Sequence, residues 1–199
     1  MKNTLALAVV AGLATVASAQ DFSLSIVDAP IQVDSTVNTT FTFDVIGDAS
    51  VGTHILGGSF AVESNSGLVT NMSWDPADWS QFDTDNGYAG NGNYNQVIFG
   101  QLVIVGVPPF DVPGPGSELG GVIGTFTVDI AANSAGTIDF SLLAQSPFSL
   151  EVVDVNTGET AQSVDGNLSL NGASINVVPA PSAMALLGLG GLVAGRRRR

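Results

Sequence analysis

Asn38-Thr-Thr-Phe-Thr-Phe-Asp-Val-Ile46 is the stretch that decides the fold class of this chain. Every second residue is apolar, so Phe41, Phe43 and Val45 share one face while threonine and aspartate occupy the other. Side chains of a β-strand point alternately to the two faces of a sheet, whereas a helix repeats its apolar residues every three or four positions. The stretch therefore predicts a strand that buries one face.

Similar alternation, or a short apolar run bounded by turn residues, recurs between residues 20 and 178. The predicted strands are residues 22–27, 38–46, 54–63, 67–73, 96–105, 119–130, 137–143, 148–155 and 168–177. The longest irregular pieces are residues 74–95 and the proline-rich residues 106–117. About nine strands with no helix between them predict one all-β domain, residues 20–178, folded as a single antiparallel β-sandwich.

Four stretches give this layout a family likeness. They are Leu-Gly-Gly-Ser-Phe-Ala-Val at 56–62, Gly-Gly-Val-Ile-Gly-Thr-Phe-Thr-Val at 120–128, Ala-Gly-Thr-Ile-Asp-Phe at 135–140 and the Asp-x-Asn-x-Gly turn at 154–158. The pattern resembles cohesin-like and related carbohydrate-binding-module sandwiches. The resemblance implies a jelly-roll or cohesin-like sandwich that binds a ligand and does not catalyse a reaction.

The N-terminal residues 1–19 predict a signal peptide. Lys2 supplies a positive start, residues 5–16 are apolar, and Ala17-Ser18-Ala19 forms an Ala-x-Ala cleavage site for signal peptidase. Cleavage there makes Gln20 the first mature residue. The apolar run is too short for the other interpretation, a permanent membrane helix.

The C-terminal residues 178–199 combine three elements. Pro179-Ala180-Pro181 is incompatible with a helix interior, and the uncharged residues 182–195 follow it. As a helix those residues span roughly 20 Å, against a hydrocarbon core of about 30 Å. The chain then ends in a positive cluster that resists crossing a bilayer, made of Arg196, Arg197, Arg198 and Arg199. These features predict a short transmembrane helix that acts as a temporary stop, the other interpretation being a core helix with a solvated basic end.

This tail resembles the PEP-CTERM sorting signal of Gram-negative envelope proteins, also catalogued under the name ice-binding protein C-terminal domain. The resemblance implies recognition of Pro179 and Pro181 by an exosortase, which cleaves near the tripeptide. It also implies a membrane anchor in the cell envelope before processing, and release to the cell surface or extracellular matrix afterwards. Ala180 departs from the family pattern, which has glutamate at that position.

Acidic and basic residues occupy different parts of the chain. All 18 acidic residues lie between Asp21 and Asp165, whereas the 5 basic residues are Lys2 and the terminal arginines. The predicted domain therefore contains no lysine or arginine, and its surface repels the phosphates of nucleic acids and anionic lipids. We exclude nucleic-acid binding on this basis. The chain has no cysteine, so stability cannot come from disulfides.

An acidic turn in the irregular piece 74–95 is the best candidate for a metal site. Asp83 and Asp85 alternate ahead of Gly87, a spacing that can place hard oxygen ligands around calcium. The EF-hand pattern fails, because Tyr88 and Tyr94 stand where it needs glycine and glutamate. The other interpretation is a solvated turn, and no further cofactor is expected.

Five aromatic residues crowd the same piece of chain. Exposed rings stack on sugars, so Trp74, Trp79 and Tyr88 are the candidate carbohydrate-binding residues, with Phe82 and Tyr94 beside them. The other interpretation is that these rings fold over the edge of the sandwich as an additional piece of core.

The sequence contains no clear catalytic motif. His54 is the one histidine, and no Gly-x-Ser-x-Gly stretch accompanies it to suggest a nucleophile. A pair of carboxylates of the glycosidase type stays open, because sequence does not give the separations between acids. We therefore predict an exported, non-enzymatic binding or structural protein associated with extracellular polysaccharide. The alternatives are a secreted glycan hydrolase and a cohesin-like protein-binding module.

Overall fold

The structure, a computed structural model, describes residues 20–36 and 39–179. The predicted signal peptide, with Ala17 and Ala19, and the predicted sorting signal from Ala180 onward lie outside the described residues. The same holds for Pro181, the predicted transmembrane residues 182–195, the arginines at 196–199, and Asn38 at the start of one predicted strand. In the described part of the chain, no helix has the length and apolar character needed to cross a membrane.

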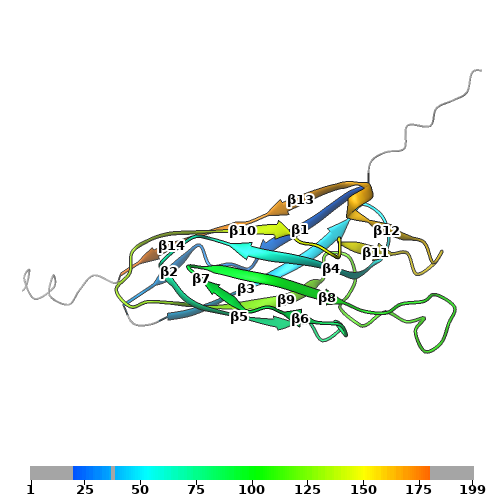
Figure 1. The fold of residues 1–199 in the computed structure, drawn as a ribbon, viewed down its shortest axis with the longest axis horizontal. Coiled ribbons are helices and arrows are strands. Elements are labelled where there is room, and N and C mark those ends of the chain that lie inside the picture. The colour runs from blue at the N-terminus through cyan, green and yellow to red at the C-terminus, as the bar shows by residue number, and fades with distance from the viewer. Residues whose placement is uncertain (1–19, 37–38, 180–199) are drawn as a thin grey trace, which may run out of the picture.

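Two sheets pack face to face, and the prediction of an all-β sandwich is confirmed (Figure 1). The first sheet has the order β13-β1-β3-β9-β5. Its strands are β1 (Asp21–Val27), β3 (Thr39–Ala49), β5 (Val69–Pro76), β9 (Val122–Ile130) and β13 (Asn167–Asn171). The stretch that begins at Thr39 lies at its centre, with Phe41, Phe43 and Val45 buried as the alternation predicts.

The second sheet has the order β12-β11-β4-β10-β14-β2, and β8 pairs with the other edge of β4. Two short strands, β6 and β7, pair with β8. The bounds are β2 (Gln32–Asp34), β4 (His54–Glu63), β6 (Thr84–Asp85), β7 (Tyr88–Gly90), β8 (Asn93–Gly100), β10 (Gly136–Ala144), β11 (Glu151–Val153), β12 (Thr160–Gln162) and β14 (Ala173–Val178). A 3₁₀ turn, η1 (Ser163–Asp165), follows β12.

The sandwich is not wholly antiparallel, which corrects the predicted topology. β1 pairs with β13 in parallel, and β14 pairs with β2 in parallel. Both parallel pairs arise because the predicted strand 168–177 is two strands in different sheets, separated at Gly172. A Cβ atom at Gly172 would lie 2.0 Å from the carbonyl oxygen of Phe140, so the crossing between sheets requires glycine.

Two further predicted strands and one predicted irregular piece differ from the structure. β8 ends at Gly100, so residues 101–105 belong to a loop, and the predicted strand 148–155 is reduced to Glu151–Val153. The irregular piece 74–95 contains the end of β5, both short strands and the start of β8. These pairings are too short to produce an alternating pattern that sequence alone can reveal.

Aromatic rings fill the space between the sheets. The ring of Phe126 on β9 lies at its centre, with centroid distances of 5.2 Å to Phe43, 4.7 Å to Trp74 and 5.0 Å to Tyr94. Phe60 on β4 joins them from the second sheet, 5.5 Å from Trp74. We call Phe43, Phe60, Trp74, Tyr94 and Phe126 the inner cluster. Packing of this kind supplies the stability that disulfides cannot supply here.

Candidate binding groove

The outer face of β4 divides into a covered part and an open part. Residues 145–149, which connect β10 to β11, cross the covered part at Ser59. Ser59 Oγ lies 2.7 Å from the carbonyl oxygens of Gln145 and Phe148, and its side chain is buried although it points away from the core. The chain therefore closes this part of the sheet face with its own loop.

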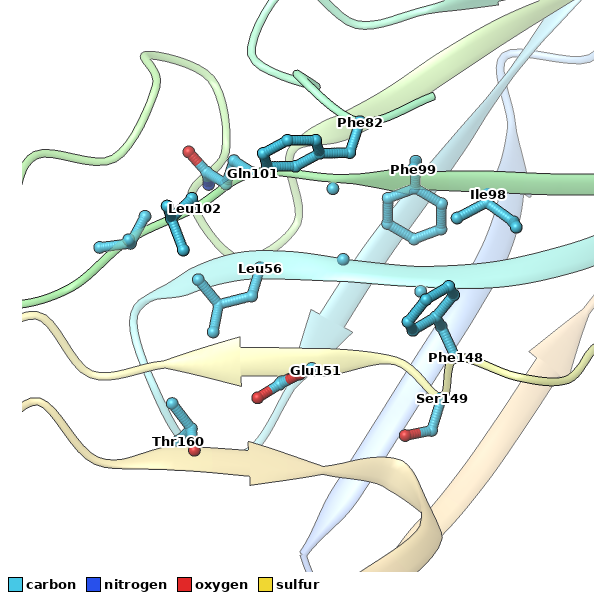
Figure 2. A pocket seen from close by; sticks show the side chains of 14 residues that line it. Leu56, Phe82, Ile98, Phe99, Gln101, Leu102, Phe148, Ser149, Glu151 and Thr160 are labelled. Carbon is cyan, nitrogen blue, oxygen red and sulfur yellow. The ribbon is translucent and has the colours of Figure 1, made fainter. Parts of the chain in front are cut away.

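The open part of the face is a groove of about 450 Å³ with a floor of glycine (Figure 2). Gly57 of β4 pairs with Gly100 of β8, and Gly58 follows on the same strand. A Cβ atom at Gly57 would lie 2.7 Å from the carbonyl oxygen of Phe99, so a side chain does not fit there without displacing backbone. Glycine thus lets the two strands approach closely and leaves the space above them open.

Two phenylalanines stand beside this floor. Figure 2 shows Phe82 reaching the groove from the side of β8 and Phe148 from the side of β4 and β11. Their side chains are 58% and 52% exposed, which is unusual for phenylalanine in a domain with a well-filled core. Aliphatic side chains complete the wall, namely Leu56, Ile98, Leu102 and Val103.

Few polar groups line the groove. The Gln101 amide is buried and structural, because Nε2 donates to the carbonyl oxygen of Ile55 at 2.7 Å and Oε1 accepts from the Gly114 N–H at 2.8 Å. The other polar side chains of the lining are Ser149, Glu151 and Thr160. The groove can therefore bind apolar groups well and offers few hydrogen bonds to a polar ligand.

The predicted calcium ligands lie in the turn between residues 80 and 94. Asp83 accepts a hydrogen bond from the Ser80 hydroxyl at 2.5 Å. Asp85 accepts one from the Gly87 N–H at 2.8 Å and one from the Tyr94 hydroxyl at 2.7 Å. Within residues 20–36 and 39–179, no group of three or more His, Asp or Glu side chains is placed to hold a metal. These carboxylates thus brace the turn, and calcium binding stays a prediction.

The structure places the three predicted carbohydrate-binding residues in the core or packed against it. Trp74 is 9% exposed and belongs to the inner cluster, and Trp79 is 4% exposed with its ring N–H donating to the carbonyl oxygen of Val122 at 2.8 Å. The Tyr88 hydroxyl donates to the carbonyl oxygen of Val69 at 2.8 Å. The two tryptophans are covered by the chain itself, and Tyr88 is partly buried against the core.

His54 takes part in a local contact at the edge of β4. Its Nε2 lies 4.0 Å from Glu118 Oε1, and its Nδ1 lies 3.0 Å from the Thr53 hydroxyl. The Thr53 hydroxyl also donates to the carbonyl oxygen of Val153 at 3.2 Å and accepts from the Val155 N–H at 3.1 Å, so it belongs to a local hydrogen-bond network.

Sequence reasoning missed the groove residues. The sequence places Phe82 among the five aromatics of residues 74–95 with nothing to set it apart, and it predicts Phe148 in a strand. The usable signal was Gly57-Gly58 inside a predicted strand, because paired glycines mark a place where backbone or a ligand approaches closely. The sequence does not show which loops meet beside those glycines.

Comparisons with known proteins give matches among solved structures. No protein-family model matches this chain, and no curated protein sequence does. A chain of the Coh-OlpA–Doc918 cohesin–dockerin complex from Clostridium thermocellum superposes with a TM-score of 0.48 at 12% identity, over 79% of this chain and 99% of that one. The cohesin module of a Clostridium perfringens family 33 glycoside hydrolase gives 0.47 at 12% identity, over 81% and 98%. The non-cellulosomal cohesin of Archaeoglobus fulgidus gives 0.42 at 10% identity, over 84% and 97%. At these values the inference of function depends on this chain's own residues.

Proposed function

We propose that this protein is an exported, non-enzymatic binding module that holds a partner protein in the groove between Phe82 and Phe148. One observation supports the proposal above the others. Two phenylalanines, each more than half exposed, stand over a glycine floor, whereas most aromatic rings of the described chain are buried. Exposed aromatic anchors beside a concave apolar surface are typical of sites where a few side chains carry most of the binding energy.

The lining favours a protein over a polysaccharide. Leu56, Ile98 and Leu102 form much of the wall, and branched aliphatic side chains present no flat face on which a sugar ring can stack. A sugar also needs hydrogen bonds to its hydroxyls, and the Gln101 amide already uses both ends within the protein. Apolar side chains of a peptide need neither a flat face nor those hydrogen bonds.

Association with extracellular polysaccharide is the second candidate. Phe82 and Phe148 do present rings to solvent, and Glu151 is close enough to the same groove to accept a hydrogen bond from a hydroxyl. A glycan hydrolase requires more, because it uses two carboxylates on either side of the scissile bond. Glu151 is the one carboxylate among the residues that line the groove.

The test compares three proteins that differ only on the surface. They are the wild type, the double variant Phe82→Ser/Phe148→Ser, and the control variant Ile31→Ser, which removes a side chain that is 87% exposed outside the groove lining. Each is immobilised and exposed to native envelope proteins and, separately, to purified extracellular polysaccharide. We expect a protein to be retained by the wild type and the control and lost from the double variant. Equal retention by all three, or selective loss of polysaccharide instead, contradicts the proposal.

We also propose that the chain reaches the cell surface by signal-peptide cleavage before Gln20 and exosortase processing near Pro179. The support is the order of the motifs in the sequence, in which the apolar and basic segments flank the acidic domain. Intact mass of protein recovered from the native envelope measures both cuts. We expect Pro179→Ala/Pro181→Ala to leave export intact and to retain the mass of the tail. A mature mass unchanged by this substitution contradicts exosortase recognition of the prolines.

A further inference from the structure

The loop between β8 and β9 carries more exposed large apolar side chains than any other connection in the described chain. Figure 1 shows it extending beyond the strands at one end of the sandwich. Between residues 102 and 112 it presents Leu102 (41% exposed), Ile104 (43%), Val105 (37%), Val107 (47%), Phe110 (44%) and Val112 (73%). We call residues 102–112 the apolar loop. Clustered apolar side chains on a projecting loop mark an interaction surface.

The apolar loop has a defined backbone conformation. The Ile104 N–H donates to the carbonyl oxygen of Phe110 at 2.6 Å, and the Val107 N–H donates to that of Ile104 at 3.0 Å. The Phe110 N–H in turn donates to the carbonyl oxygen of Val107 at 2.9 Å. The loop thus pairs its own backbone groups while pointing apolar side chains outward. A surface held in this way loses little conformational freedom on binding.

The base of the loop is fixed to the sandwich. Gln101 joins the backbone of Ile55 on β4 to that of Gly114 on the returning chain, through hydrogen bonds of 2.7 and 2.8 Å. Ser117 is fully buried at the same place, and its hydroxyl donates to the carbonyl oxygen of Gly114 at 2.7 Å. The orientation of the loop relative to the groove is therefore set by buried polar contacts.

Groove and loop form one continuous surface. Leu102 and Val103 line the groove, and they are also the first two residues of the apolar loop. Further along, Val105 lies against the β11–β12 turn, where a Cβ atom built at Gly158 would be 3.5 Å from Val105 Cβ. A partner that fills the groove thus meets the loop without a gap.

The charges around this surface have one sign. Glu151 lines the groove, Asp111 lies within the apolar loop, and Glu159 follows Gly158 in the adjacent turn. Residues 20–178 contain no lysine or arginine. A second copy of the domain would therefore meet like charge, and a bilayer would meet no cation for its phosphates. A partner with lysine or arginine beside its apolar side chains meets complementary charge instead.

We propose that the groove and the apolar loop together dock a partner-protein segment whose apolar side chains are flanked by lysine or arginine. The inference rests on the proposed function and adds the chemistry of the partner and a second contact element. The groove takes the apolar anchors of the segment, the loop covers them from one end, and the carboxylates at the rim meet its cations.

Two synthetic peptides test this docking by fluorescence anisotropy. Both alternate leucine and valine; one carries lysines at both ends and the other glutamates. The loop variant is Val107→Ser/Phe110→Ser/Val112→Ser, and the control is Ile31→Ser/Val164→Ser, whose side chains are 87% and 72% exposed away from the groove and loop. We expect the lysine peptide to bind the wild type and the control, and to bind the loop variant at least about tenfold more weakly. Its affinity should fall with added salt, and the glutamate peptide should not bind.

Several results would overturn the inference. Equal binding of the two peptides to the wild type would show that charge plays no role. Equal binding of the lysine peptide to the wild type and to the loop variant would show that the loop plays no role. If the lysine peptide does not bind the wild type, neither part of the inference holds. Loop-dependent binding to phosphatidylcholine vesicles assigns the surface to a membrane, and a loop-dependent dimer in sedimentation assigns it to a second copy. If the envelope partner is lost from Phe82→Ser/Phe148→Ser but kept by the loop variant, the groove function stands and this inference fails.

Discussion

The inner cluster and the groove contain the same kinds of side chain in opposite environments. Trp79 is 4% exposed, and Phe82, three residues later on the same connection, is 58% exposed. On β4 the division runs along one strand, with Phe60 turned into the cluster and Leu56 turned into the groove. Inside, the chain supplies every neighbour of each ring. Outside, glycine leaves a space that the chain does not fill.

This difference separates two uses of apolar surface. Rings inside the sandwich stabilise the fold, so removing one costs free energy of unfolding. Rings at the groove contribute little to folding, so removing one should affect a partner and leave the domain intact. Four substitutions test the distinction, ordered by the size of the expected change in stability.

Phe126→Ala should have the largest effect. It removes the ring that contacts Phe43, Trp74 and Tyr94 at centroid distances of 5.2, 4.7 and 5.0 Å. Large-to-small changes of this kind leave a cavity and cost about 3–5 kcal/mol. Urea unfolding followed by tryptophan fluorescence measures the loss, with Phe82→Ala as the matched exposed control. A loss from Phe82→Ala as large as that from Phe126→Ala contradicts the division between the two regions.

Gly124→Ala should have the next largest effect. A Cβ atom there would lie 2.4 Å from the Trp74 ring and 2.6 Å from the carbonyl oxygen of Asp75. Because one of these neighbours is backbone, the inner cluster must shift, at a cost of about 1–3 kcal/mol. Gly67→Ala is the control, since no atom lies within 4 Å of a Cβ atom at that glycine. Thermal unfolding of both variants should show a lowered Tm for Gly124→Ala only.

Tyr94→Phe should change the pH dependence of stability. Burial, the hydrogen bond to Asp85 and the charge of that carboxylate raise the pKa of Tyr94 well above its ordinary value. An unfolded tyrosine ionises at about pH 10, so above that pH the wild type should lose up to about 1.4 kcal/mol of stability per pH unit. Below that pH the contribution is fully present. Tyr94→Phe should lose less stability between about pH 9 and pH 11. Urea midpoints that fall in parallel for both proteins would contradict this.

Phe82→Ser/Phe148→Ser should have the smallest effect on stability. Both rings are already more than half exposed, so the free energy of unfolding should change by less than about 1 kcal/mol. Partner retention should nevertheless be lost. If the double variant folds and still retains its partner, the groove is not the binding site. If the double variant is unfolded, the two rings are needed for folding and belong to the core.

The sequence was sufficient for the all-β class and for the buried face of β3, because period-two alternation records which face is buried. It could not give the division of residues 168–177 between two sheets, since both halves alternate and only the space available at Gly172 decides. The groove was hidden for a related reason. Exposure of Phe148 depends on the path of residues 145–149 across Ser59, a contact between positions distant in sequence. The burial of Trp79 was equally hidden, because an aromatic residue in an irregular piece gives the same sequence pattern whether a neighbouring strand covers it or not.

One feature of the fold determines how the module is presented. β14 ends at Val178, at the end of the long axis opposite to the apolar loop (Figure 1). If the proposed anchor lies in the chain after Val178, the length of the sandwich separates it from the apolar loop.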